Sequence, residues 1–172
     1  MSRKEERIMI AHTIAGISAL IDDRETKRMY AMLEYPDYNI SALQNFKRNL
    51  QQRHESLEQY FSPLGIDPLK SQDISVIEID PHKQQVMYYF EYLVIGRVDE
   101  EYRKILNDPD ISTTEKTDFG FETNYIINEQ KEKAWLAISV NVYLPWLYDD
   151  MPIPVPKHIN KAVLPELNVD AG

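Results

Sequence analysis

The sequence predicts an α+β protein in which N-terminal helices pack on a mainly antiparallel sheet of about four strands, followed by an extended proline-rich C-terminal arm. Helical spacing of apolar residues dominates the first third of the chain, period-two alternation dominates residues 119–144, and half of the ten prolines follow residue 144. The 172 residues, 43% hydrophobic and 27% charged, are enough to bury a core. We therefore expect a single domain over residues 1–145 and an arm over residues 146–172.

A first helix is predicted from apolar residues spaced by four, three and four positions, which share one helical face. They are Ile10, Ile14, Ile17 and Ile21. Asp22 and Glu25 form a capping-box pattern for a second helix, or a kinked continuation of the first, over residues 24–33. Pro36 follows its end.

A longer helix is predicted from Ser41, with that serine as N-cap and Gln44 at the third helical position. Its apolar stripe consists of Leu43, Phe46, Leu50, Leu57 and Tyr60, interrupted by Arg53. The segment SPLG at residues 62–65 ends the helix, because proline removes an amide donor and glycine permits the C-terminal turn.

Strands are predicted further along the chain. Residues 74–79 and 85–95 are rich in β-branched and aromatic side chains, which fit a pleated sheet better than a helix. Residues 85–106 admit two interpretations: a strand followed by a short helix capped by Asp99, or one helix interrupted by Gly96.

Residues 119–127 and 136–144 each alternate with period two, and the polar link NEQKEK joins them. This pattern predicts an antiparallel hairpin with one covered face. The even positions of 136–144 are expected to face the core, and the odd positions to face solvent.

The arm contains a tryptophan and a tyrosine followed by the segment MPIPVP, which can form neither a helix nor a central strand. Aromatic side chains are common in interface cores, so the arm is predicted to bind a partner. The predicted partner-binding residues are Trp146, Tyr148, Asp149, Asp150, Pro152, Pro154 and Pro156.

Composition excludes several function classes. The absence of cysteine excludes disulfides, thiolate metal sites and thiol nucleophiles. The net charge is −9, and its excess lies in residues 71–172, which makes nucleic-acid binding unfavourable. No apolar run reaches the length of a membrane-spanning helix, and no nucleotide-binding or hydrolase motif occurs. We expect no cofactor, no metal and no membrane contact, and a location in the cytoplasm or in a particle assembled there.

Some polar pairs could carry chemistry. His54 and Glu58 lie four residues apart on the predicted helix, and Asp80 and His82 flank a proline at a turn. The acidic clusters at 99–101 and 149–150 could bind a metal. For each of them the structural interpretation is preferred: a solvent-facing pair, a turn, a helix start or a loop.

The sequence therefore predicts a non-enzymatic structural or adaptor protein that acts through protein–protein contacts, as a homo-oligomer or as a subunit of an assembly such as a phage particle. One alternative is an acidic inhibitor or immunity protein that covers a basic nuclease or toxin. A second alternative is a metal-independent or carboxylate–histidine enzyme that the motifs do not reveal.

Overall fold

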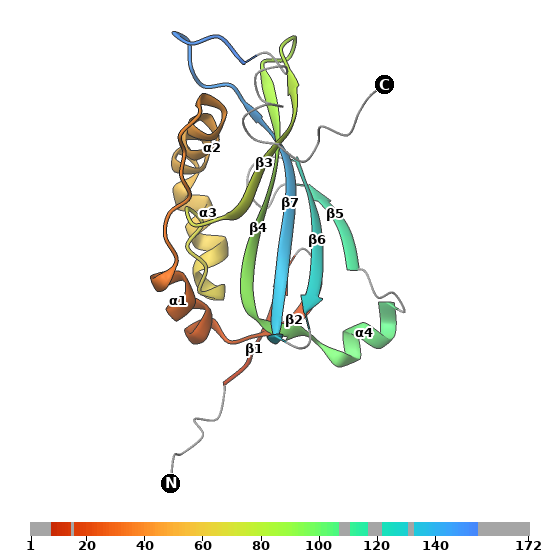
Figure 1. Ribbon diagram of the computed structural model, residues 1–172. Coiled ribbons are helices and arrows are strands. Elements are labelled where there is room, and N and C mark those ends of the chain that lie inside the picture. Colours follow the sequence, from red (N-terminus) through yellow and green to blue (C-terminus); the bar gives the residue numbers. More distant parts are fainter. Residues whose placement is uncertain (1–7, 15, 107–110, 117–121, 131–132, 155–172) are drawn as a thin grey trace, which may run out of the picture.

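The computed structural model describes residues 8–14, 16–106, 111–116, 122–130 and 133–154. Within them a seven-stranded antiparallel sheet has the strand order β1-β2-β4-β7-β6-β5, with β3 also paired to β4, and helices α1 to α3 lie against one face (Figure 1). The strands are β1 (Ile10–Ile14), β2 (Ile17–Ile21), β3 (Gln72–Asp80), β4 (Gln85–Val98), β5 (Ile111–Lys116), β6 (Glu122–Gln130) and β7 (Trp135–Pro145). The helices are α1 (Asp23–Met32), α2 (Ser41–Gln52), α3 (His54–Phe61), the short 3₁₀ helix η1 (Ser62–Leu64) and α4 (Glu100–Leu106).

The α+β class is confirmed, but the sheet has more strands than expected. The predicted first helix is wrong, because its residues form the β1–β2 hairpin. Ile10 pairs with Ile21, and Ile14 pairs with Ile17. The hairpin therefore places the isoleucines beside one another in two cross-strand pairs, where a helix would place them on one face. Gly16, at a φ of 78°, supplies the left-handed residue that a tight turn needs and a helix does not.

The second predicted helix is confirmed as α1, and its cap is the one expected: the Glu25 amide donates to Asp22 Oδ1 at 3.0 Å. This helix closes a gap in the sheet. Along one edge of β4, β3 pairs with residues 85–91 and β2 with residues 96–98. Between them the Ile95 amide donates to Thr26 Oγ1 at 2.9 Å and the Leu93 amide to the Tyr30 hydroxyl at 3.0 Å. Side chains of α1 therefore take the place of a strand there.

The predicted long helix is divided into α2 and α3 at Arg53, whose guanidinium turns back to Asn49 Oδ1 at 3.0 Å. Ser41 is the first helical residue rather than the N-cap, which is Ile40 with no side-chain bond. The predicted end is confirmed: Gly65 has a φ of 80°, and a Cβ there would lie 2.2 Å from the Asp23 carbonyl oxygen. This glycine allows η1 to pack against the start of α1.

The core lies between the helices and the sheet and is centred on aromatic rings. Phe46 of α2 packs against Tyr88 and Phe90 of β4 at ring-centroid distances of 5.1 and 4.9 Å. Phe61 of α3 packs against Tyr92 at 4.5 Å. Burial of these rings joins the helices to the central strand.

The two interpretations of residues 85–106 are resolved in favour of a strand and a short helix, β4 and α4, with the Glu101 amide bound to Asp99 Oδ1 at 2.9 Å. The β6–β7 hairpin is also confirmed, with Ile127 paired to Ile138. Residues 119–121 of the predicted strand lie outside the described residues. The edge strand β5 was not predicted, because its sequence ISTTEK lacks apolar alternation.

The predicted face assignment of β7 is only half correct. All even positions from Leu136 to Leu144 are buried, as expected. Ala137 and Ser139, expected to face solvent, are also buried, at 4% and 7% exposure. Both are small and pair directly with larger residues of β4, Leu93 and Glu91, which stand beside them on the second face.

Candidate functional site

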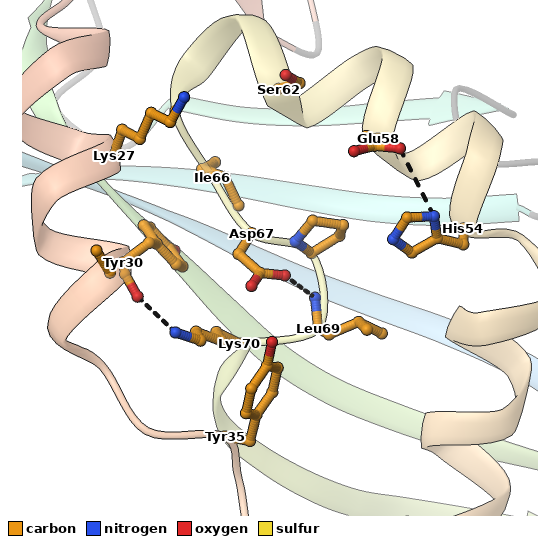
Figure 2. A pocket seen from close by; sticks show the side chains of 13 residues that line it. Lys27, Tyr30, Tyr35, His54, Glu58, Ser62, Ile66, Asp67, Leu69 and Lys70 are labelled. Carbon is orange, nitrogen blue, oxygen red and sulfur yellow. Dashed lines mark hydrogen bonds and ion pairs between the residues drawn. The ribbon is translucent and has the colours of Figure 1, made fainter.

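Two hollows on the helical side are formed by residues that the structure describes. The first, called here the α1–α3 cleft, lies between α1, α3 and residues 65–70 and has a volume of about 430 Å³ (Figure 2). Tyr35, 61% exposed, is at its rim. Its other lining residues include Lys27, Tyr30, His54, Glu58, Ser62, Asp67 and Lys70.

The polar groups at the centre of the α1–α3 cleft hold the backbone. Lys70 Nζ donates to the Tyr30 carbonyl oxygen at 2.8 Å, near the C-terminus of α1, and its ammonium group lies 4.9 Å from the Tyr35 ring centroid. Asp67 Oδ1 accepts from the Leu69 amide at 3.0 Å, which closes the turn beneath the cleft. Burial raises the pKa of Tyr30 well above its ordinary value, because the ionised phenolate would lose its hydration.

His54 and Glu58 lie on the α3 side of the same cleft, where His54 Nδ1 and Glu58 Oε2 are 3.7 Å apart. Both side chains are about half exposed. This is the solvent-facing i,i+4 pair that the spacing indicates, and exposed pairs of this kind contribute little to stability.

The second hollow, called here the α2–arm pocket, has a volume of about 480 Å³. Its lining combines cations with aromatic rings and amides. Arg48 stacks on the Tyr148 ring at 4.8 Å, and Lys47 Nζ lies 5.3 Å from the Tyr38 ring centroid. The lining residues are Tyr38, Gln44, Lys47, Arg48, Gln51 and Tyr148, with no carboxylate among these described residues.

Hydrogen bonds hold the start of the arm next to this pocket. The Trp146 amide donates to the Gln84 carbonyl oxygen at 2.8 Å, and the Leu147 amide donates to Asn45 Oδ1 at 2.9 Å. Asn45 and Asn49 of α2 both donate to the Pro145 carbonyl oxygen, at 3.2 and 3.0 Å. These bonds hold the start of the arm beside α2 (Figure 1).

The structure places the predicted partner-binding residues in different environments. Trp146 is half-buried and packs against the protein's own core, and its indole Nε1 donates to the Met151 carbonyl oxygen at 2.8 Å. Tyr148 is half-buried and lines the α2–arm pocket. Asp149, Asp150 and Pro152 are exposed, Pro154 is half-buried, and Pro156 lies outside the described residues.

Sequence reasoning missed the cationic half of this pocket. Lys47 and Arg48 are adjacent on the polar face of α2, where a charge usually indicates only solvent exposure. The aromatic partners come from the preceding loop, Tyr38, and from the arm, Tyr148. No local spacing in the sequence links α2 to the arm, which lies about a hundred residues further along the chain.

The remaining polar candidates have structural contacts. Asp80 Oδ1 accepts from the amides of His82 and Lys83, each at 3.0 Å, and these bonds, the Lys83 amide first, lower the pKa of Asp80. The carboxylate therefore caps the turn between β3 and β4 instead of pairing with the imidazole. Among the described residues, no group of three or more histidines and carboxylates is placed to hold a metal ion.

Comparison of the chain with models of protein families, with curated proteins and with solved structures gave no match. None of the helices in the described ranges has the length and apolarity required to cross a membrane.

Proposed function

We propose that the protein is a non-enzymatic adaptor or structural subunit that acts through protein–protein contacts, in the cytoplasm or in a particle assembled there. The contacts are made by the α2–arm surface, which consists of Tyr38, Lys47, Arg48, Tyr148, Asp149 and Asp150. One observation carries the proposal: this surface combines aromatic rings with charged groups that form no ion pair among the described residues.

The composition of this surface supports a contact role. Tyrosine and arginine are enriched in protein interfaces because they bury a large area and offer directed polar groups. The surface is also preorganised, since Asn45 and Asn49 hold the chain at Pro145 and Leu147. A surface held in place before binding loses less conformational entropy when a partner docks.

The inhibitor alternative is favoured by a different observation. Asp149 and Asp150 are exposed at a bend held by the bond between Trp146 and Met151, so they could enter a basic cleft of a partner. The enzyme alternative has less support, because Lys70, Asp67 and Asp80 are already bound to the backbone.

The proposal is tested by the size of the native complex. In an extract of its own cells, fractionated by size and detected with an antibody, the wild-type protein should elute well above the size of a single chain. Tyr148→Asp should shift it toward the single-chain position, whereas Tyr35→Asp, on the α1–α3 cleft, should not. Elution of the wild-type protein only as a single chain would contradict the proposed function.

A further inference from the structure

The α2–arm pocket is chemically suited to an anionic group. Lys47 and Arg48 project from one turn of α2, and Gln44 and Gln51 add amide donors one turn away on either side. A carboxylate entering the pocket would meet two positive charges and the amide donors of both glutamines. Tyr38 and Tyr148 would shield these contacts from solvent.

An acidic turn begins where this pocket ends. Asp149 and Asp150 directly follow Tyr148, and both are exposed. The turn is closed at one end by the Leu147 amide on Asn45, and it is bridged by the indole of Trp146 bonded to the Met151 carbonyl oxygen. The two carboxylates are therefore presented on a backbone that is already ordered.

The four charges have no ion-pair partner in the part of the chain that the structure describes. They belong to Lys47, Arg48, Asp149 and Asp150, and each cation lies over a tyrosine ring. A basic pocket and an acidic turn lie side by side on one surface but do not neutralise each other.

Resting on the proposed function, we propose that the partner at this surface is a second copy of the same chain. A two-fold axis through an interface brings each patch against its own copy, so a patch with adjacent basic and acidic parts is self-complementary. The acidic turn of each copy enters the α2–arm pocket of the other, and every pair is formed twice. The charge complementarity thus favours a symmetric dimer despite the net charge of −9 on each chain.

Exchange of the charges tests this dimer. One variant carries Lys47→Glu with Arg48→Glu, and a second carries Asp149→Lys with Asp150→Lys. Sedimentation of the full chain should show that the wild type dimerises, and that each variant alone self-associates at least about tenfold more weakly, because like charges meet at both contacts. An equimolar mixture of the two variants should recover the dimer, since the acidic turn and the pocket again have opposite charges.

A matched control carries Arg24→Glu with Lys104→Glu, two exposed cations on α1 and α4, away from α2. It changes the net charge by the same amount as the pocket variant and should leave the dimer intact. Circular dichroism confirms that each variant is folded. Three results would overturn the proposal. The wild type could stay monomeric at about 100 μM, taken as the limit of a specific weak dimer. The charge reversals could leave self-association unchanged, or the mixture of the two variants could stay monomeric. A monomer that still enters a large complex in its own cells would contradict the second copy but leave the proposed function standing.

Discussion

Asn45 is the residue at which α2, β4 and the arm meet. Its side chain is fully buried, its Nδ2 donates to the Tyr88 hydroxyl at 3.1 Å and to Pro145, and its Oδ1 accepts from Leu147. A buried amide in such a network specifies one arrangement of the three segments, because any other leaves polar groups without partners.

Asn45→Leu should lower the free energy of unfolding by about 2 to 3 kcal/mol, because the Leu147 amide loses its acceptor while the volume is nearly kept. The neighbouring exposed residue provides a control: Gln44→Leu should change it by less than about 0.5 kcal/mol. Urea denaturation of both variants measures the difference. Equal effects would show that the amide network does not hold the arm.

Buried tyrosines make the stability depend on alkaline pH. Burial, followed by the charge of Asp67, raises the pKa of Tyr38 to about 12, and burial raises the pKa of Tyr88 and Tyr30 further. In the unfolded chain a tyrosine ionises near pH 10, so between about pH 10 and 12 the folded state binds more protons. The tyrosine contribution is therefore complete below about pH 10 and is lost as the pH rises toward 12.

The free energy of unfolding of Tyr38→Phe should fall less steeply between about pH 10 and 12 than that of the wild type. The variant lacks a phenol that binds its proton more tightly in the folded state than in the unfolded state. Denaturation at a series of pH values measures the slope for the wild type and the variant. Identical slopes would mean that the Tyr38 phenol ionises equally in the folded and unfolded states.

At the scale of elements, α1 acts as part of the sheet edge. Thr26 is fully buried, and its Oγ1 donates to the Asp22 carbonyl oxygen at 2.8 Å and accepts from the Ile95 amide. The hydroxyl thus connects the first turn of α1 to β4 at the place where, along this edge, neither β2 nor β3 pairs with it.

Thr26→Val keeps the shape of the side chain but removes both bonds, and it should cost about 2 kcal/mol of stability because the Ile95 amide is left without an acceptor. Thr26→Ser keeps the hydroxyl and should cost clearly less. Thermal melting compares the two variants. A valine variant as stable as the serine variant would show that the helix does not complete this edge.

The second face of β7 is also sensitive to charge. Ser139 Oγ donates to Glu91 Oε1 at 3.0 Å, and the Tyr89 hydroxyl donates to the same carboxylate oxygen. Ser139→Asp therefore places a second carboxylate beside Glu91 and should cost about 2 kcal/mol at pH 7, less near pH 4 where carboxyl groups protonate. Ser139→Ala should be milder. A mild effect of Ser139→Asp at pH 7 would contradict this burial.

On the opposite, core-facing side of β7, Val140→Asp should unfold the protein, because it buries a carboxylate without a partner.

Local signals predicted much of the fold. The Asp22 cap, the proline–glycine end of α3 and the pattern that predicts strand β7 each act within a few residues. The cap, the helix end and the strand itself are confirmed, whereas the faces of β7 are only half correct. The prediction of the first helix is wrong because the spacing of the four isoleucines fits both a helix and a hairpin. The left-handed conformation of Gly16 favours the hairpin. Ser139 is buried because of its neighbour Glu91 on β4, and the periodicity of a single strand gives no information about the neighbouring strand.

At the scale of the whole molecule, the α2–arm surface depends on contacts between distant segments. Trp146 and Tyr148 are predicted to contact a partner, and that prediction stays untested. In the structure their rings contact each other at a centroid distance of 5.6 Å, the tryptophan also packs against the protein's own core, and the tyrosine lines the pocket. Arg48, which stacks on Tyr148, was not predicted because it lies about a hundred residues away in the chain.

The two hollows on the helical side allow a direct comparison. Tyr148 lines the α2–arm pocket, and Met151 lies in the acidic turn that follows it. Tyr35 lines the α1–α3 cleft, and Met32 lies three residues before it; these two are 61% and 79% exposed. Both side-chain types react with hydroxyl radicals in proportion to their exposure, so each hollow contains its own probe.

Hydroxyl-radical footprinting of the assembled and dissociated protein, read by mass spectrometry, tests most directly whether the α2–arm surface makes the contacts. Oxidation of Tyr148 and Met151 should fall severalfold on assembly, while oxidation of Tyr35 and Met32 stays unchanged. Protection of Tyr35 and Met32 without protection of Tyr148 and Met151 would contradict the central claim and would assign the contacts to the α1–α3 cleft.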